Sequence, residues 1–473
     1  MEDAAADVAV VGGGIIGVTT AFALARTGAK VILVEGGRLG QGVTGRTTAK
    51  VTSLHGLTYA SLLRSHGIEK TRAYAAANEA GLAMIAANVD ELAIECDFRR
   101  KPNFTYTQSA ERVRQLEDEA ESAEKAGLPV SLVEQTDLPF DVAAAVRLSD
   151  QAEFHPIRYL LGLASAAEAA GAGIHEGSRA TGVASGRVEL ENGVSVSAGR
   201  IVMATHLPIL DRAGTFALAE PERSSAITVG LDGEPPHGMF ISADSPSRTL
   251  RAVPHDGREL LIVGGSSQRI GEGDPGAVLA ELADFADEHF AATDVVHRWS
   301  AHDYLPVDGL PYIGRTPLGG QEVLIATGMR KWGLAMGTAA AEILADLVMG
   351  ADNEWAEVFD PRRLPGLRAM PALAKHNAGA GLHFLGDRMR LSRSPDLALG
   401  EGAVVGSGLA KRAMYRDDDG TVHALSARCT HLGCLVHWNA GDRTWDCPCH
   451  GSRFKATGEV LEGPATAALP PRE

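Results

Sequence analysis

The pattern of apolar and polar positions at the start of the chain predicts a strand, a turn, a helix and a second strand. Residues 7–11 form an almost unbroken apolar run, which is typical of a central parallel strand covered on both faces. Apolar residues then recur at helical spacing over 15–26, and Thr27-Gly28 supplies a stop signal. Residues 30–35 form a second buried strand. The chain is therefore expected to open with a parallel α/β unit.

Further segments extend this pattern along the chain. Two later strand-like runs, 200–205 and 323–328, end in small residues, so the parallel sheet is expected to be assembled from separated stretches. Residues 58–95 and 108–127 are rich in Ala, Leu and Glu and are expected to be helical. Residues 215–300 alternate strand-like and turn-rich segments, as a smaller antiparallel domain would.

The composition changes after Gly350. Residues 351–395 are rich in Pro, Arg and Gly with weak periodicity, which predicts a linker between domains. From Gly402 to Glu473 the chain reads as strands and turns, with an Asp-Gly hairpin signal at 419–420. A third, all-β unit is therefore expected at the C-terminal end.

Length and charge narrow the classes of function. A chain of 473 residues with 45% hydrophobic content is long enough for roughly three domains with their own cores. The 44 Lys and Arg against 60 Asp and Glu give a formal net charge of −16, which argues against nucleic acid as a partner. We find neither a basic leader nor an apolar run of roughly 18 residues, so no signal peptide or membrane span is expected. A cytoplasmic location follows by default.

A dinucleotide-binding fingerprint follows the first strand. Gly12 permits the tight turn, Gly14 lets the backbone approach a pyrophosphate, and Gly17 allows the helix to pack closely on the strand. The helix that starts at Ile15-Ile16 points its free N–H groups at the phosphates. Glu35, at the end of the second strand, is placed to accept hydrogen bonds from a ribose. These residues predict a dinucleotide site but leave FAD and NAD open.

Two boxes of cysteine and histidine predict a metal centre near the C-terminal end. They read CTHLGC over 429–434 and CPCHGS over 447–452. One Cys and one His from each box suffice to hold a two-iron cluster, with two thiolates on one iron and two imidazoles on the other. The alternative is a zinc knuckle. A single residue between Cys429 and His431 is tighter than ordinary zinc-finger spacing, and that reading leaves two cysteines unexplained. The remaining cysteine, Cys96, is expected to be a small buried hydrophobe.

The N-terminal part resembles the D-amino-acid oxidase and glycine oxidase superfamily of flavoproteins. The resemblance covers about residues 5–350, with the fingerprint close to the start and three further segments, 40–50, 308–314 and 326–333, that match flavin-contacting segments. It implies non-covalently bound FAD. The further cofactor-binding residues that it implies are Thr44, Thr47, Thr48, Gly328, Trp332 and Gly333.

The two boxes are similar to those of Rieske proteins of the cytochrome bc-complex type. By that resemblance Cys429 and Cys447 bind one iron of a [2Fe-2S] cluster, and His431 and His450 bind the other. Cys434 and Cys449 match a pair that is disulfide-linked in those proteins. Ser452 matches a hydroxyl that donates to a cluster sulfide. Phe454 stands where high-potential members have a tyrosine, so a lower potential is expected.

Together these features predict an α/β FAD-binding Rossmann-like domain with an inserted antiparallel α+β substrate domain, plus a C-terminal all-β Rieske domain. The oxidoreductase occupies 1–350, the linker 351–395 and the Rieske domain 396–473. Within the first part, we expect nucleotide-binding segments at about 5–95, 150–214 and 301–350, and substrate-domain segments at about 96–149 and 215–300.

The expected activity is oxidation of a small organic substrate, at a C–N bond by family analogy. Electrons would then pass singly through the cluster to an external acceptor of the ferredoxin, cytochrome or quinone type. The candidate proton-moving residues are Lys50, His55, His302 and Lys331, and no counterpart of the substrate-carboxylate arginine of amino-acid oxidases is evident. Reverse electron flow and a redox carrier without its own substrate are alternatives.

A second iron site of the kind found in Rieske aromatic-ring hydroxylases is a further alternative. Asp294, His297 and His302 fit the D-x2-H-x4-H spacing of that two-His, one-carboxylate site. We treat the match as coincidence, because in those enzymes the Rieske boxes precede the catalytic domain and there is no flavin fingerprint at the start.

Overall fold

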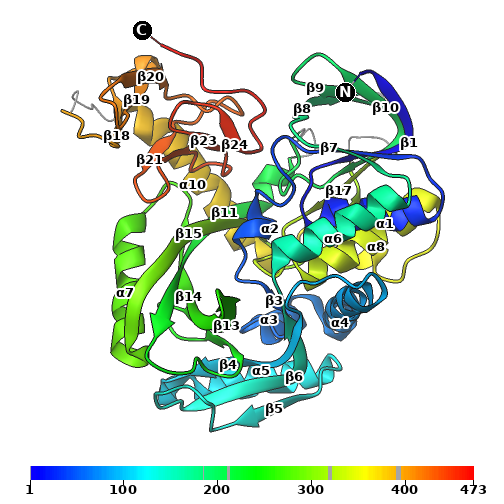
Figure 1. Cartoon of the computed structure of the whole chain (residues 1–473), viewed down its shortest axis with the longest axis vertical. Helices are drawn as coiled ribbons and strands as arrows, with labels where there is room; N and C mark the ends of the chain where they lie inside the picture. The colour runs from blue at the N-terminus through cyan, green and yellow to red at the C-terminus, as the bar shows by residue number, and fades with distance from the viewer. Residues whose placement is uncertain (1, 185, 210–213, 318–321, 390–395, 473) are drawn as a thin grey trace.

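The structure is a computed structural model, and it describes residues 2–184, 186–209, 214–317, 322–389 and 396–472. Figure 1 shows three groups of strands: an N-terminal sheet with its helices, a large second sheet, and small C-terminal sheets drawn in orange and red. The expected fold class, an α/β nucleotide-binding fold with an α+β part and a C-terminal all-β domain, is confirmed.

The first sheet is assembled from distant parts of the chain. Its order is β16-β17-β10-β1-β2-β7, and the pairs from β17 to β7 are parallel. A hairpin, β8-β9, extends it through β10. The strands are β1 (Ala4–Val11), β2 (Val31–Val34), β7 (Gly173–His175), β8 (Ala180–Ala184), β9 (Arg187–Leu190), β10 (Ser195–Met203), β16 (Tyr312–Arg315) and β17 (Val323–Thr327).

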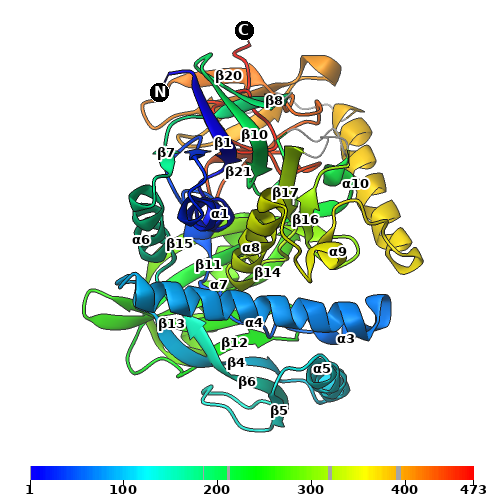
Figure 2. The ribbon, with the colours of Figure 1, turned by 90° about the vertical axis from the view of Figure 1, so that its right-hand side faces the viewer.

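The two faces of β1 contribute to two cores, because successive side chains of a strand point to opposite faces. Val8 and Val10 belong to the core formed with the helices, whereas Ala9 and Val11 belong to the core beneath the β8-β9 hairpin. This explains the unbroken apolar run. Figure 2 shows α8 (Ala335–Met349) between α1 (Ile15–Arg26) and α4 (Ile68–Glu91). The other helices of this part are α2 (Val43–Arg46), α3 (Thr58–His66), α5 (Val113–Lys125), α6 (Pro156–Ala169) and α9 (Ala356–Phe359).

The helical stretch expected over 58–95 consists of two helices. Gly67 divides α3 from α4 with a φ of +78°, a conformation that glycine adopts without steric cost. The expectation for 108–127 matches η1 (Ala110–Arg112) and α5.

The second sheet is mostly antiparallel, with the order β15-β11-β14-β13-β12-β4-β6-β3, and β5 pairs with β6. Its strands are β3 (Lys50–Val51), β4 (Arg99–Thr107), β5 (Val130–Val133), β6 (Ala144–Glu153), β11 (Ala219–Leu231), β12 (Met239–Ser242), β13 (Arg248–His255), β14 (Arg258–Arg269) and β15 (Ala292–Pro306). β3 and the end of β15 both belong to this second sheet, although their residues fall in segments expected to bind the nucleotide. The domain boundaries themselves stay a prediction.

One helix within 215–300 was not expected from the sequence. α7 (Pro275–Phe290) covers one face of the second sheet with Val278, Leu282 and Ala286. Its start is well defined, because the Asp274 side chain accepts a hydrogen bond from the Gly276 N–H and Pro275 occupies the first turn.

The C-terminal domain consists of two small antiparallel sheets around one core. The first contains β18 (Gly402–Val405), β19 (Arg412–Arg416) and β20 (Val422–Ser426), and the second contains β21 (His437–Asn439), β22 (Thr444–Asp446), β23 (Arg453–Lys455) and β24 (Val460–Glu462). Cys429, Cys434, Cys447 and Cys449 lie inside the common core.

The segment expected as a linker contains a long helix. α10 (Met370–Met389) runs along the C-terminal sheets in Figure 1. Its apolar positions have little helical periodicity, and contacts with other elements hold it instead. The His376 ring contacts the Phe216 carbonyl at 3.0 Å, and the Asn377 amide donates to the Ala217 carbonyl.

Candidate functional site

The glycines of the fingerprint are fixed by close approaches of the backbone. Gly12 has a φ of +110°, and a Cβ there would lie 2.4 Å from the Ala204 carbonyl oxygen. A Cβ on Gly17 would lie only 1.9 Å from the Gly12 carbonyl oxygen. Both contacts are with backbone, which does not move aside as a flexible side chain does. The first turn of α1 therefore lies directly against the turn that follows β1.

The polar groups around this turn suit a dinucleotide. The Glu35 carboxylate accepts hydrogen bonds from the backbone N–H groups of Gly13 and Gly37, each at 2.7 Å. The Ile15 N–H donates to Thr44 Oγ1 at 3.0 Å. The N-terminal end of α1, which is the positive end of its dipole, lies at this turn, and that suits an anionic pyrophosphate.

Replacing Gly17 with alanine is expected to weaken FAD binding. The new methyl group overlaps the Gly12 carbonyl, and overpacking of about 1–3 kcal/mol would displace the start of α1. The expected result is roughly 10–100-fold weaker binding, measured as the FAD dissociation constant by flavin fluorescence. Gly381→Ala in α10 is the matched control, because a Cβ there meets no atom within 4 Å. Equal FAD affinity in the two variants would contradict the assigned role of Gly17.

A cavity of about 690 Å³ extends from the fingerprint to the second sheet. Its wall includes most of the expected cofactor-binding residues, namely Gly12, Gly14, Ile15, Ile16, Glu35, Thr44, Thr47, Thr48, Trp332 and Gly333. Gly17 lies beneath Gly12, and Gly328 lies against the Pro306 ring. The volume and the glycine-lined end are appropriate for a dinucleotide with a small substrate beside it.

The turn after β17 forms one side of this cavity in an unusual backbone conformation. Gly328, Arg330 and Lys331 have φ values of +77°, +53° and +70°. The Asp303 carboxylate accepts hydrogen bonds from the Lys331 N–H and the Tyr304 N–H, and it lies 2.8 Å from His206 Nε2. Such left-handed residues are retained where the surrounding structure holds them, and they concentrate at functional sites.

Lys50 and Lys331 both line the cavity, and both have partners. Lys50 Nζ donates to the Phe240 carbonyl and to Thr249 Oγ1. Burial, with a smaller contribution from Arg251, holds the pKa of the Lys50 amine well below its usual range. Lys331 Nζ forms an ion pair with Glu222 at 2.9 Å.

His302 also lines the cavity, whereas His55 lies behind it. His302 Nδ1 is in short contact with a Glu462 carboxylate oxygen, and its buried Nε2 has no hydrogen-bond partner among the described residues. The two ring nitrogens of His55 are taken by Tyr74 Oη and the Thr52 carbonyl. Burial lowers the pKa of His55 to about 3. Its ring stacks on Trp332 at 4.4 Å, so Trp332 stands between His55 and the cavity.

The two boxes of the C-terminal domain converge in its core. The thiols of Cys429 and Cys447 are hydrogen-bonded to each other, and the rings of His431 and His450 lie 5.1 Å apart. Backbone N–H groups donate to both sulfurs: those of His431 and Leu432 to Cys429, and those of Cys449 and His450 to Cys447. Two thiols and two imidazoles from two loops match the ligand set of a Rieske cluster.

Burial keeps both histidines neutral, the form that binds a metal. It lowers the pKa of His431 to about 4 and that of His450 to about 3. Nδ1 of His431 is buried and has no hydrogen-bond partner among the described residues, as expected of an atom that awaits a ligand bond. Ser452 lies at the same site. Its hydroxyl is hydrogen-bonded to the Cys429 sulfur and accepts a hydrogen bond from the Ala465 N–H at 3.0 Å. The residues therefore fit a [2Fe-2S] cluster.

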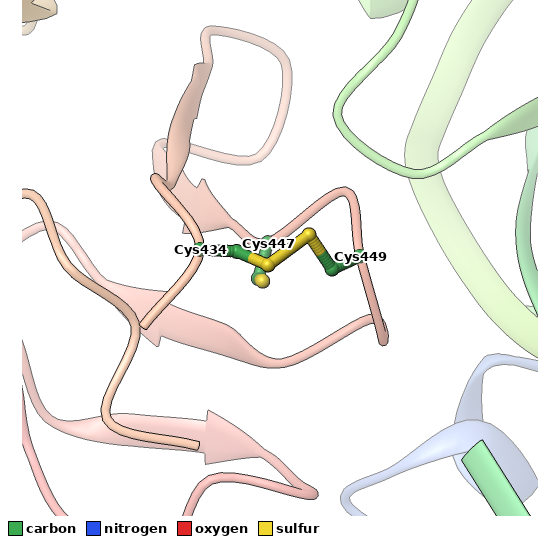
Figure 3. A group of neighbouring side chains, drawn as sticks. All are labelled: Cys434, Cys447 and Cys449. Carbon is green, nitrogen blue, oxygen red and sulfur yellow. A yellow bond between two sulfur atoms is a disulfide. The ribbon is translucent and has the colours of Figure 1, made fainter. Parts of the chain in front are cut away.

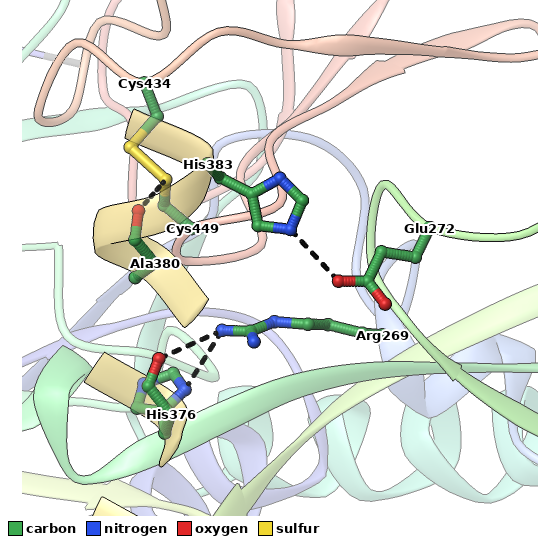
Figure 4. The surroundings of a disulfide bond; sticks show 7 residues. All are labelled: Arg269, Glu272, His376, Ala380, His383, Cys434 and Cys449. Carbon is green, nitrogen blue, oxygen red and sulfur yellow. Dashed lines mark hydrogen bonds and ion pairs between the residues drawn. A yellow bond between two sulfur atoms is a disulfide. The ribbon is translucent and has the colours of Figure 1, made fainter. Parts of the chain in front are cut away.

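The structure contains the disulfide between Cys434 and Cys449. Figure 3 shows it beside Cys447, and the sulfurs of these three residues lie within 4.8 Å of one another. The bridge ties the two loops together and leaves Cys429 and Cys447 as free thiols. Figure 4 shows how α10 covers it: the Ala380 carbonyl lies 3.7 Å from the Cys449 sulfur, and His383 contacts Glu272 at 3.0 Å. Cys96 is also free and buried, and it belongs to the main core.

The C-terminal domain also forms part of the cavity wall, which the sequence did not indicate. Its contribution is the stretch around β24, with Lys455, Glu459, Val460, Leu461, Glu462, Gly463, Ala465, Thr466 and Ala468. Tyr304 of β15 adds a direct link, since its hydroxyl donates to the His450 carbonyl at 2.9 Å. No motif marks Glu462 or Tyr304, because each acquires its place only from the contact between domains.

The spacing of Asp294, His297 and His302 does not produce a metal site. His297 contacts the Thr228 hydroxyl, Asp294 lies 3.8 Å from Arg258, and His302 pairs with Glu462. Within the part of the chain that the structure describes, the only group of three potential ligands found close together is that of Cys434, Cys447 and Cys449. In the same part of the chain, no helix combines the length and apolar character needed to cross a membrane.

Comparison with solved structures shows the fold of the first part. Glycine oxidase from Geobacillus kaustophilus matches with a TM-score of 0.65 and 21% identity, over 77% of this chain and 100% of that chain. L-proline dehydrogenase from P. horikoshii matches with a TM-score of 0.64 and 20% identity, over 76% and 98% respectively.

Sequence comparison covers the chain more completely. A Bacillus subtilis protein named as a Rieske 2Fe-2S iron-sulfur protein, YhfW, is 33% identical over 99% of this chain and 93% of its own length. A cytochrome b6-f complex iron-sulfur subunit from Chlorobaculum thiosulfatiphilum is 38% identical over 17% of this chain and 48% of its own. The model of the FAD dependent oxidoreductase family matches residues 7–347, and the Rieske [2Fe-2S] domain model matches residues 388–472. The chain therefore belongs to the FAD dependent oxidoreductases and carries a C-terminal Rieske [2Fe-2S] domain, so its cofactors are FAD and a [2Fe-2S] cluster.

Proposed function

We propose that this enzyme oxidises a small organic substrate at a C–N bond and passes the electrons singly to an external acceptor. The observation that carries the proposal is the shared cavity, whose wall combines the dinucleotide fingerprint with the segment around β24 of the Rieske domain. FAD supplies hydride chemistry when bound, and the cluster supplies one-electron transfer. A cavity bordered by both domains suits an enzyme in which the two kinds of chemistry follow each other.

The residues proposed to hold the cofactors are those that the geometry brings together. Gly12, Gly14, Gly17 and the start of α1 would hold the pyrophosphate of FAD, and Glu35 would bind the adenosine ribose. Cys429 and Cys447 would bind one iron, and His431 and His450 the other.

The other cavity residues would position the substrate and move protons. Lys50 is a buried amine whose pKa is lowered by burial, so it is suited to accept a proton from a substrate ammonium. Lys331 is paired with Glu222 and would contribute position rather than proton transfer. His55 has no access to the cavity and would act only by supporting Trp332.

Oxidation at a C–N bond is supported by what the matching structures are named for. Glycine oxidase and L-proline dehydrogenase are named for compounds in which such a bond is available for oxidation. The expected external partner is a one-electron acceptor of the ferredoxin, cytochrome or quinone type.

An anaerobic titration with candidate amines tests the proposal. Glycine, N-methylglycine, proline and simple amines without a carboxylate are added in turn. The flavin absorbance and the electron spin resonance signal of the reduced cluster are recorded together. The expected result is flavin bleaching followed by the cluster signal with at least one compound. Bleaching that occurs only when an external one-electron donor is supplied would instead establish reverse electron flow.

A further inference from the structure

A buried contact between a histidine and a carboxylate crosses from the Rieske domain to the wall of the flavin cavity. Glu462 belongs to β24 and His302 to β15, and both line the cavity. His302 is 2% exposed, and its Nδ1 lies in a short contact with a Glu462 carboxylate oxygen. Nε2 of the same ring is buried without a hydrogen-bond partner among the described residues. The ring therefore faces Glu462 through Nδ1, and no described residue of the protein supplies a hydrogen-bond partner for Nε2.

Lys50, Lys331 and His206 also line the cavity, and each of them has a hydrogen-bond or ion-pair partner. Lys50 Nζ is satisfied by the Phe240 carbonyl and Thr249, and Lys331 Nζ by Glu222 and Ser267. The His206 Nε2 atom is bonded to Asp303. A buried polar atom without a partner has a cost of about 1–3 kcal/mol, so its retention in a cavity wall indicates a ligand or a proton-transfer role.

Glu462 is itself held by a network that joins the two domains. Arg453 contacts Glu462 at 3.5 Å, Asp442 at 2.6 Å and Asp446 at 3.2 Å. Asp446 in turn pairs with Arg223 of β11 at 3.0 Å. In these ion pairs three carboxylates meet two guanidinium groups. Arg46 of α2 adds a weaker attraction to Glu462.

The charged and titratable groups that act on His302 come from three places in the fold. Glu462 of β24 favours its charged form, whereas His206, which follows β10, and Arg453 of β23 disfavour it. Burial lowers the pKa of His302, and Glu462 opposes that shift. Burial raises the pKa of Glu462, but His302 and Arg453 outweigh it and hold that pKa below its usual range. His302 is thus neutral at rest, and Glu462 makes it a stronger base than it would otherwise be in this position.

We propose that His302 exchanges the proton that accompanies electron transfer between the flavin and the cluster, and that Glu462 of the Rieske domain is its positioning residue. The proposal rests on the proposed exchange of electrons between the two centres. Oxidation of reduced flavin, FADH⁻, releases two electrons and one proton. The electrons leave singly for the cluster, which an external acceptor reoxidises each time. The proton passes to Nε2 of His302, whose imidazole becomes an imidazolium opposite the Glu462 carboxylate. Electrons and the proton would therefore leave the cavity at the same wall.

Flash reduction of the flavin tests the proposal without any substrate. The rate at which the cluster signal appears is followed by rapid-freeze electron spin resonance between pH 5 and 9, in H₂O and D₂O. In the wild type this rate is expected to rise with pH through the pKa of His302 and to be slower in D₂O. His302→Gln should lower the plateau roughly 10²–10⁴-fold, the usual effect of losing a positioned proton-transfer group.

Glu462→Gln keeps the size of the side chain but removes its charge. The pKa of His302 should then fall. The increase of the cluster-reduction rate with pH should therefore move to lower pH, and the rate at its plateau should drop roughly tenfold for a change of about one pKa unit. Glu462→Asp should recover part of the rate. The pH dependence of the flavin midpoint potential should change in the same direction, which a purely structural role of Glu462 would not cause. FAD and iron contents are measured for every variant.

Asp442→Asn is the matched control, since it removes a carboxylate from the same network without touching His302. It should leave the pH profile unchanged. An unaltered profile in Glu462→Gln, or an equal shift in Asp442→Asn, would overturn the role of Glu462. Failure of reduced flavin to reduce the cluster in the wild type would instead overturn the proposed function itself.

Discussion

Replacing His450 with alanine is expected to abolish electron delivery to a one-electron acceptor while substrate still reduces the flavin. The substitution removes one of the two imidazoles proposed to bind the second iron. Mutation of a residue that only hydrogen-bonds to a metal ligand typically lowers metal affinity about 10–100-fold. Loss of a ligand itself should therefore reduce turnover of the acceptor by more than about a hundredfold. The measurements are iron content, the cluster signal, reduction of an artificial acceptor and the rate of flavin bleaching under anaerobic conditions.

The position of His450 calls for a companion variant. Its ring contacts Phe216 at 4.6 Å and its carbonyl accepts the Tyr304 hydroxyl, so the variant also alters packing beside the flavin domain. His431 lies on the other loop and is farther from Phe216, at 6.0 Å between ring centroids, so His431→Ala should give the same result. His423→Ala, which removes a histidine that pairs with Asp417 away from both boxes, should keep iron and activity. Equal loss of flavin reduction and electron delivery in both ligand variants would contradict the order of the two steps.

Replacing Arg453 with alanine is expected to be the most destabilising change at the domain interface. The guanidinium is 1% exposed and contacts Asp442, Asp446 and Glu462. Removing it leaves three buried or partly buried carboxylates that repel one another, and breaking a buried ion pair from one side costs about 3–5 kcal/mol. Chemical denaturation, followed by the loss of the visible cluster spectrum, measures the free energy of unfolding of this domain. FAD affinity should fall as well, because Glu462 lines the cavity.

Two further arginine variants serve as controls for Arg453→Ala. Arg443 pairs with Asp418 at 2.9 Å on the surface of the same domain, so Arg443→Ala should leave the denaturation midpoint almost unchanged. Arg453→Lys keeps the charge but loses the planar fork that reaches three carboxylates, and it should fall between alanine and the wild type. If Arg453→Ala and Arg443→Ala unfold at the same denaturant concentration, the buried network does not hold the interface.

Local motifs account for most of what could be predicted. The fingerprint depends on backbone contacts between neighbouring segments, such as Gly17 against Gly12, so residue type and spacing alone reveal it. The cluster loops follow the same logic, because two short boxes carry all four proposed ligands and both bridged cysteines. The signal for α7 was also present, in Asp274, Pro275 and the apolar residues four apart, but the strand-rich surroundings obscured it.

Other features had no signal in the sequence. The apolar periodicity of α10 is weak, and the helix is held partly by polar contacts with Phe216 and Ala217, which leave no pattern in the sequence. His55 and His302 were equivalent candidates by position, yet one is sealed behind Trp332 and the other lines the cavity. Which side of a strand or turn reaches the cavity depends on packing from elements far away in the chain.

The sequence by itself indicated a dinucleotide site, a metal centre built from cysteine and histidine, and the class of each domain, because these depend on short-range spacing and on the chemistry of glycine, cysteine and histidine. The choice of FAD over NAD came from resemblance to a family. Only the tertiary structure decided how the two sites meet: Tyr304 against the His450 loop, and Glu462 beside His302 in the cavity wall. The physical reason is that an ion pair or hydrogen bond across a domain interface requires geometry but no recurring pattern along the chain. Its members can therefore be recognised only once the domains are in contact.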